Sequence, residues 1–188
     1  MSYEDQISNL DKTDLHHELD KIMSYLSRGK MFHYNNSFGL RMLALRGFAN
    51  LHDKESICDY KHMICIKKIA GDKLEYCPHI DFNIAHEFKD FKIESMNDFK
   101  NSFKVWEQSE TELEKCITKA LKCAAEEDIQ LYKELICLAD EVQQERMRAD
   151  MIYKRCELGQ WGGHDLARIS KDIHCHLESH DDLDFTLS

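Results

Sequence analysis

Proline occurs once in this chain of 188 residues, at Pro78, and glycine occurs only seven times. Proline kinks or ends a helix and glycine weakens one, so a chain with so few of either can sustain long helices. Charged residues make up 32% of the chain and hydrophobic residues 43%, which suits helices that are each solvated on one side and buried on the other. We therefore expect an all-α protein with a single domain over residues 1–188.

Apolar residues recur every three or four positions along most of the chain, as Leu15, Leu19, Ile22 and Leu26 do near its start. Residues 72–95 lack this period and hold the only proline, which predicts a long connection that crosses the length of a bundle. The expected helices cover 14–35, from Ser37 or Gly47 to Gly71, 97–125, the stretch after Asp128 up to Gly159, and 165–177. Four of them would form a bundle over residues 9–158, followed by the short fifth helix and an acidic tail over 178–188.

The net charge of −10 argues against a nucleic-acid partner and against an anionic membrane surface, and it favours cations as ligands. No apolar run is long enough to span a bilayer, and the first residues carry acid where a secretory signal carries base. We therefore expect a cytoplasmic protein without a membrane partner. Eight cysteines are scattered through helical stretches without a Cys-x-x-Cys pair, which favours reduced thiols over disulfides.

Asp59 and His62 stand three positions apart on an expected helix. This spacing places both side chains on one face, where they could bind one metal ion. Helix bundles with carboxylate-bridged iron sites are built from an acidic residue followed three positions later by histidine. The pair therefore points to iron chemistry, although the same spacing also arises by chance on solvated helix faces.

The residues Gly47-Phe48-Ala49, followed by Asp59 and His62, resemble the second helix of ferritin subunits, where a Phe-Ala pair precedes a Glu-x-x-His metal motif. The stretch from Leu166 to Leu177 looks like the short fifth helix of ferritins. The resemblance covers about residues 9–177. It implies an up-down-down-up four-helix bundle with a long crossover connection, and a hollow shell, as a homo-oligomer of 24 subunits or by co-assembly with a complete ferritin subunit.

The resemblance also implies a set of iron ligands. On the second helix Asp59 takes the glutamate position and His62 the histidine position, and on the third helix Glu110 is the best match, with Glu107 as a rival one turn away. On the fourth helix Gln143 or Gln144 is expected to point inward, and Gln143 would orient oxygen or water. Fe(II) would thus meet Asp59, His62, Glu110 and Gln143.

The first helix departs from the ferritin pattern. Counting back from Phe48 places Ser24 where the first glutamate ligand belongs and Met31 where a tyrosine stands near the irons. A register shift could instead bring Glu18 or Tyr34 to the site. Serine is a poor iron ligand beside a carboxylate, so we expect the ferroxidase activity, the oxidation of Fe(II) by oxygen, to be weak or lost.

Three functions follow from these observations. The first is an iron-storage and sequestration subunit of a hollow oligomeric shell, a protein that binds Fe(II) and Fe(III). The second is a non-catalytic ferritin homologue that acts as a structural shell partner or as a chaperone-like protein. The third is a helix bundle unrelated to iron, in which Asp59 and His62 form a surface pair.

Overall fold

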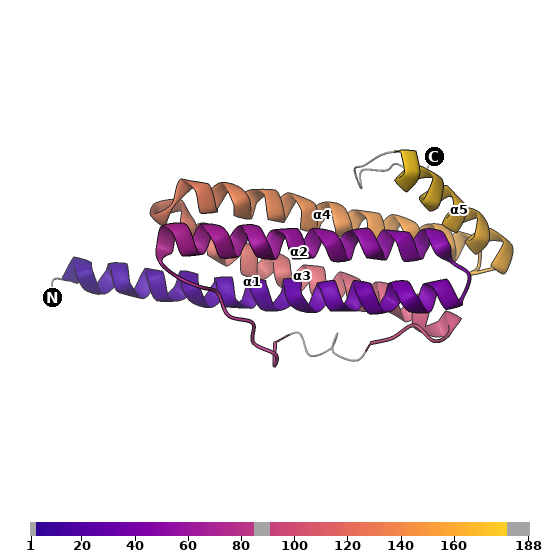
Figure 1. Cartoon of the computed structure of the whole chain (residues 1–188), viewed down its shortest axis with the longest axis horizontal. Coiled ribbons are helices and arrows are strands. Elements are labelled where there is room, and N and C mark those ends of the chain that lie inside the picture. The colour runs from indigo at the N-terminus through magenta and orange to yellow at the C-terminus, as the bar shows by residue number, and fades with distance from the viewer. Residues whose placement is uncertain (1–2, 85–90, 180–188) are drawn as a thin grey trace.

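The computed structural model describes residues 3–84 and 91–179, and these residues form five α-helices. Four long helices lie side by side as a bundle, and a shorter fifth helix is inclined to them at one end (Figure 1). The helices are α1 (Tyr3–Met42), α2 (Arg46–Leu74), α3 (Met96–Glu127), α4 (Ile129–Leu158) and α5 (Gly163–Ser179). The predicted all-α fold, a four-helix bundle with a short fifth helix, is confirmed.

The order of the helices is up, down, down, up, as predicted. Three residues join α1 to α2, so these helices run antiparallel, whereas residues 75–84 lead away from the end of α2 along α1 and residues 91–95 lead into α3 near the other end of the bundle (Figure 1). The described part of this connection is held against α1 by hydrogen bonds. Tyr76 Oη donates to Asp20 Oδ1 at 2.7 Å, and the Asp81 amide donates to Ser24 Oγ at 2.8 Å. The long crossover therefore leaves α2 and α3 parallel.

Two predicted helix ends are wrong. The second helix was predicted to begin at Ser37 or after Gly47, but α1 continues to Met42, and Ser37 Oγ donates to the Tyr34 carbonyl at 2.9 Å. Gly71 was expected to end the second helix, yet α2 runs on to Leu74 and closes where Glu75 adopts a left-handed φ of 51°. Serine and glycine weaken a helix only slightly, and tertiary packing of a long amphipathic helix outweighs that preference.

The turn between α3 and α4 is confined to one residue. Asp128 is extended, and its Oδ1 accepts hydrogen bonds from the amides of Gln130 at 2.9 Å and Leu131 at 2.8 Å. This side chain satisfies two of the amides that the first turn of a helix leaves without a partner. Asp128 therefore starts α4 immediately after α3 has ended at Glu127, where a turn over residues 126–128 had been expected.

Each long helix turns a line of residues spaced four and three apart toward the bundle axis, the spacing of helices packed nearly parallel. In α3 and α4 every residue of the line is buried. The α3 line is Phe99, Phe103, Trp106, Glu110, Leu113, Ile117, Ala120 and Ala124, and the α4 line is Leu131, Leu135, Leu138, Val142, Glu145, Ala149, Ile152 and Cys156. We call these the core lines. Each is apolar except for one glutamate near its middle.

The apolar core is divided into two clusters along the bundle. The aromatic cluster lies toward α5 and includes Phe32, Phe48, Phe99, Phe103 and Trp106 with residues of α5. The aliphatic cluster lies toward the other end and includes Leu15, Leu19, Ile22, Leu113, Ile117, Leu131 and Leu135. The α5 helix is seated closely on α2, because the Gly47 amide donates to Ser170 Oγ at 2.9 Å and a Cβ at Gly47 would meet the Ser170 carbonyl oxygen.

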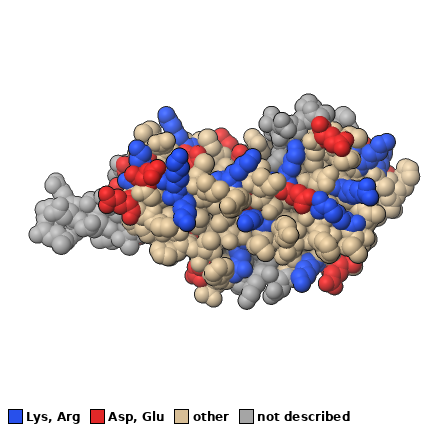
Figure 2. Space-filling model, viewed as in Figure 1, with Lys and Arg blue, Asp and Glu red and all other residues tan. Residues whose placement is uncertain are grey.

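The outer faces are charged, as predicted for a helix bundle in water. Lys and Arg side chains are interspersed with Asp, Glu and uncharged residues on the face shown in Figure 2. Among the described residues, no helix combines the length and the apolar character needed to cross a membrane.

Candidate metal centre

A layer of buried polar side chains separates the aromatic cluster from the aliphatic cluster. Every helix of the four-helix bundle contributes to it, and each of its side chains is at most 7% exposed. Its members are His33 from α1, His52, Glu55 and Asp59 from α2, Glu110 from α3, and Glu145 and Arg148 from α4. We call this set the polar layer. Burying a polar group costs free energy unless a hydrogen-bond or charge partner satisfies it, so the residues of this layer need such partners or a bound ligand.

Three members of the layer converge as metal ligands could. His33, Glu110 and Glu145 each place one nitrogen or oxygen within 4.8 Å of the other two, and they come from three different helices. Imidazole and carboxylate together form the donor set that suits iron, zinc and manganese. Among the described His, Cys, Asp and Glu residues, these three are the ones whose ligand atoms lie close enough together to hold one metal ion.

The surroundings of the layer's carboxyl groups favour their protonated form. Burial, together with neighbouring acids, raises the pKa of Glu55 to about 7 and that of Glu110 to about 8. The same causes raise the pKa of Asp59 and of Glu145 well above the usual range of carboxyl groups. A bound cation would reverse this effect, because it favours the charged form of each carboxyl group near it. The layer is therefore suited to exchanging protons for a metal ion.

One protein cation already lies in the layer. Arg148 Nε is 3.3 Å from Glu55 Oε1, and the guanidinium lowers the pKa of Glu55 and of Glu145 against the larger effect of burial. Glu55 is also within hydrogen-bonding reach of the Glu145 carboxyl group, whereas Asp59 Oδ2 is buried and lacks a hydrogen-bond partner among the described residues. Arg148 thus compensates part of the charge at Glu55 and leaves Asp59 Oδ2 without a partner.

The two histidines of the layer contact each other directly. His33 Nδ1 lies 2.7 Å from His52 Nδ1, and the Trp106 ring stands about 5 Å from both imidazoles, with centroid distances of 4.9 and 5.1 Å. Burial lowers the pKa of His52 to about 3 and that of His33 well below 6.5, so both rings are neutral at neutral pH. A neutral imidazole has one nitrogen with a lone pair, which is the form that binds metals.

Two of the four residues predicted as iron ligands, Asp59 and Glu110, lie in the polar layer. Asp59 is pressed against α1 at Gly29, where an added Cβ would stand 2.9 Å from Asp59 Oδ2. Glycine therefore occupies the place on α1 that faces this carboxylate, so no side chain of α1 projects toward Asp59 from that position. The role of Asp59 and Glu110 in binding a metal stays a prediction.

The structure does not bring the other two predicted ligands to the layer. His62 lies between α2 and α4, with Nε2 bonded to the Glu141 carboxylate and Nδ1 3.8 Å from Glu134 Oε1. Gln143 is exposed and lines a surface hollow between α3 and α4 together with Glu107. The inward residue of α4 is Glu145, two positions further along.

The α1 residues considered for the iron site lie outside the polar layer. Ser24 is buried, donates to the Asp20 carbonyl at 2.7 Å and accepts from the crossover connection. Glu18 accepts a hydrogen bond from Lys21 Nζ at 2.8 Å. Met31 is 45% exposed and Tyr34 63% exposed, so both face outward. The α1 residue that meets the carboxyl groups of α3 and α4 is His33, which sequence reasoning missed.

The core lines alternate spacings of four and three residues, and this pattern in the sequence could have identified His33. On α1 this spacing continues from Leu26 through Gly29 to His33, and on α4 it passes from Val142 to Glu145. Gln143 directly follows Val142 and is therefore turned about 100° away from the core line. A polar residue on such a line must be buried, so the spacing alone predicts His33 and Glu145.

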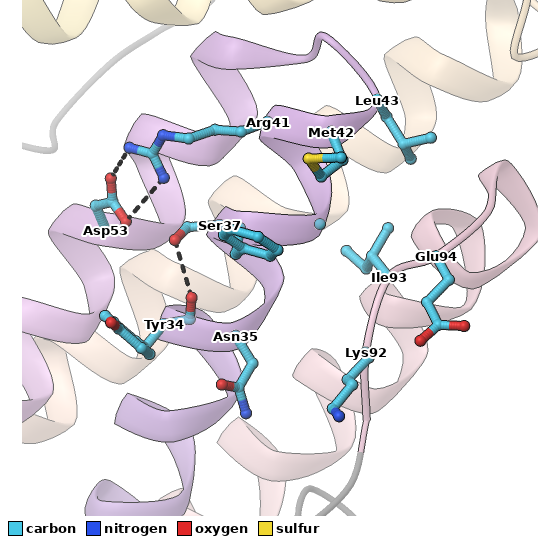
Figure 3. Close-up of a pocket in the computed structure, with 12 residues that line it drawn as sticks. Tyr34, Asn35, Ser37, Arg41, Met42, Leu43, Asp53, Lys92, Ile93 and Glu94 are labelled. Atoms are coloured by element: carbon cyan, nitrogen blue, oxygen red, sulfur yellow. Dashed lines mark hydrogen bonds and ion pairs between the residues drawn. The ribbon is translucent and has the colours of Figure 1, made fainter.

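A separate hollow of about 670 Å³ lies on the outer side of α1. Figure 3 shows Asn35 of α1 opposite Lys92 of the crossover connection, with Tyr34 directed away from Lys92 and the paired Arg41 and Asp53 at the edge of the hollow. This hollow is lined by none of the polar-layer residues. It belongs to the exterior of the bundle, whereas the candidate metal centre is enclosed.

Comparisons with known proteins place this fold. Neither a protein-family profile nor a curated protein sequence matches the chain. Among solved structures, a helix bundle of the ferritin class matches with a TM-score of 0.60 over 92% of this chain and 98% of the other. That protein is an open-pore ferritin from the hyperthermophilic archaeon Archaeoglobus fulgidus, and it is 16% identical to this chain. The chain therefore has the ferritin fold, as the resemblance of residues 47–62 predicted.

Proposed function

We propose that this chain is a ferritin-like subunit that binds Fe(II) at the polar layer and sequesters iron within a hollow oligomeric shell. The observation that carries the proposal is the convergence of His33, Glu110 and Glu145 within 4.8 Å of one another in the centre of a ferritin fold. Helix bundles of this kind build iron sites from inward-facing carboxylates and histidine. Iron is the cargo of such a protein.

The layer fits a divalent cation on grounds of charge. Glu55, Asp59, Glu110 and Glu145 are buried near one another, and each has a raised pKa. An entering Fe(II) ion would take oxygen ligands from this set and displace protons from it, because the ion stabilises the ionised carboxylates. Asp59 Oδ2, which lacks a hydrogen-bond partner among the described residues, is the oxygen that gains most from such an ion.

We also propose that oxidation of iron by this chain is weak. Arg148 engages Glu55, and α1 presents Gly29 rather than a carboxylate to Asp59. A second cation beside the first would need these carboxylates and would be repelled by the guanidinium. We infer one cation per polar layer, whereas a dinuclear centre would need two.

Assembly into a shell has support from the outer face of α1. Four large apolar side chains stand exposed there at spacings of three and four: Met31 (45%), Tyr34 (63%), Phe38 (69%) and Met42 (75%). An apolar stripe of this size on a single helix marks an interaction surface. We propose that it packs against other copies of the chain, or a complete ferritin subunit, in a 24-subunit shell located in the cytoplasm.

Titration of the metal-free protein with Fe(II) under anaerobic conditions tests the metal centre. Calorimetry is expected to show one tight site per chain in the wild type and its loss in Glu110→Gln and Glu145→Gln. The control is Gln143→Ala, whose exposed side chain should leave binding unchanged. Equal binding by all three variants would place the iron elsewhere and overturn the proposal.

Aerobic Fe(II) oxidation and particle size complete the test. Ferric absorbance should rise slowly in the wild type, and light scattering with electron microscopy should show a hollow particle. A hollow particle without specific Fe(II) binding would instead support the structural shell partner or chaperone-like protein, a reading that the Arg148 ion pair within the layer favours. A monomer without binding would support a bundle unrelated to iron.

A further inference from the structure

We propose that His52 is a positioning residue that sets the tautomer of His33, so that His33 binds the metal ion through Nε2. The inference rests on the proposed function, because it assumes that a cation enters the polar layer. It adds a residue that lies outside the converging group of His33, Glu110 and Glu145.

The geometry between the two imidazoles requires one shared proton. His33 Nδ1 and His52 Nδ1 are 2.7 Å apart, a hydrogen-bond distance, and both side chains are buried at 1% and 2% exposure. A hydrogen bond at this distance requires one Nδ1 to donate and the other to accept. Two arrangements follow, and they differ in which nitrogen of His33 carries its hydrogen.

Only one of these arrangements permits metal binding. If His33 donates from Nδ1, its Nε2 holds a lone pair and can coordinate a cation. If His33 accepts at Nδ1, its Nε2 carries the hydrogen and presents a positive dipole to the cation. A bound metal therefore selects the arrangement in which His52 Nδ1 is the acceptor. Metal-bound histidines are commonly oriented in this way by an acceptor on the other ring nitrogen.

The surroundings of His52 make its Nδ1 the acceptor that is available to the Nδ1–H group of His33. The Phe32 ring lies 6.1 Å from His52, and the Trp106 ring contacts both imidazoles within the aromatic cluster. These rings exclude the water that could otherwise accept the hydrogen from His33. Loss of the His52 nitrogen would leave His33 Nδ1 without a partner in an apolar pocket, and a buried donor without a partner is costly.

Two variants of His52 separate orientation from mere packing. His52→Leu fills most of the space without an acceptor, whereas His52→Asn retains an acceptor oxygen near the position of Nδ1. We expect Co(II) affinity, measured by calorimetry, to fall about 10- to 100-fold in His52→Leu and to stay within about threefold of wild type in His52→Asn. Thermal unfolding of both variants checks that they fold. Equal losses in the two variants would overturn the proposal and indicate a packing role.

The tautomer itself can be observed in the wild-type protein, which removes any dependence on variants that fail to fold. Solid-state ¹⁵N NMR of histidine-labelled protein loaded with Zn(II) should show His33 protonated at Nδ1 and coordinated at Nε2. Coordination through Nδ1, or a proton on Nε2, would overturn the inference while leaving the proposed function intact. Absence of Zn(II), Co(II) and Fe(II) binding by the wild type would instead overturn the proposed function.

Discussion

The aliphatic cluster and the polar layer occupy neighbouring turns of the same four helices, yet they are built on opposite principles. In the aliphatic cluster the core lines carry Leu, Ile and Ala, which gain free energy from burial without needing partners. In the polar layer the same lines carry His33, Glu110 and Glu145, whose burial costs free energy unless protons or a cation compensate it. The comparison teaches that the first region stabilises the bundle by burial alone, whereas the second needs protons, Arg148 or a bound cation to compensate its buried carboxyl groups.

The strongest test of this difference removes the protein cation from the polar layer. Arg148→Met would leave Glu55 buried without its ion-pair partner, and loss of one partner of a buried pair costs about 3–5 kcal/mol. Urea unfolding of the metal-free protein at pH 8 and a fixed protein concentration measures this loss. Adding Glu55→Leu should restore most of it, because no unpaired charge then remains. A loss below about 1 kcal/mol in the single variant would show that the pair is not structurally important.

A cavity in the aliphatic cluster should separate stability from binding. Leu135→Ala removes a fully buried side chain and is expected to lower the free energy of unfolding by about 2–5 kcal/mol. The affinity of the folded protein for Co(II), measured by calorimetry, should not change, because the polar layer keeps all its groups. A parallel loss of affinity would mean that the two regions are energetically coupled.

The glycine that faces Asp59 offers a matched pair of substitutions. Gly29→Ala would place a Cβ 2.9 Å from Asp59 Oδ2, so the carboxylate must shift, with an expected cost of about 1–3 kcal/mol. Gly71→Ala is the control, because it lies inside α2 with nothing closer than 4.0 Å and should stabilise the protein by about 0.5–1 kcal/mol. Chemical unfolding compares the two. A stabilising Gly29→Ala would refute the close contact with Asp59.

The stability of the metal-free protein should fall as pH rises from 6.5 to 8. The folded protein keeps protons on Glu55 and Glu110 up to pH values of about 7 and 8, whereas the unfolded chain releases them near 4.5. The folded state therefore binds more protons in this window, which makes the free energy of unfolding decrease with pH. The expected slope is about 1 kcal/mol per pH unit.

Below pH 6.5 the buried histidines act in the opposite direction. The unfolded chain protonates His33 and His52 there and the folded protein does not, which offsets the protons that the folded protein holds on Glu55 and Glu110, so stability depends less steeply on pH than it does above pH 6.5. Thermal unfolding across the range from pH 5 to 8 measures both limbs. Glu110→Gln should flatten the slope between pH 6.5 and 8, and below pH 6.5 it should remove one of the carboxyl protons that offset the histidines. A slope of the opposite sign in the upper window would contradict the assignment of raised pKa values.

The smallest effect is expected at His62. Its ion pairs with Glu141 and Glu134 lie at the margin of the core, with the Glu141 side chain 48% exposed, so water and salt screen them. His62→Ala should lower the free energy of unfolding by less than about 1 kcal/mol and leave Co(II) affinity unchanged. A tenfold loss of affinity would show that His62 belongs to the metal centre and should be added to the polar layer.

Much of the fold could be predicted from local pattern. The scarcity of proline and the apolar period predicted the helices, and the long aperiodic stretch before Met96 predicted the crossover connection. For the candidate centre, Asp59 was singled out by its position after Phe48 and Glu110 by its match to a ferritin glutamate on the third helix, and both lie in the polar layer. His33 and Glu145 were missed because the prediction followed a resemblance rather than the core lines. Gln143 illustrates the consequence of following the resemblance, because a shift of one or two residues along a helix rotates a side chain out of the core.

The sequence by itself determined the helices, the two apolar clusters and the turns at which polar residues interrupt the core lines. These properties depend on spacing within one helix, which the chain carries locally. Only the tertiary structure decided that His33 meets His52, that Arg148 pairs with Glu55 and that Gly29 makes room for Asp59. Each of these contacts joins two helices, and it depends on how far one helix is rotated and shifted against the other, which no single segment specifies.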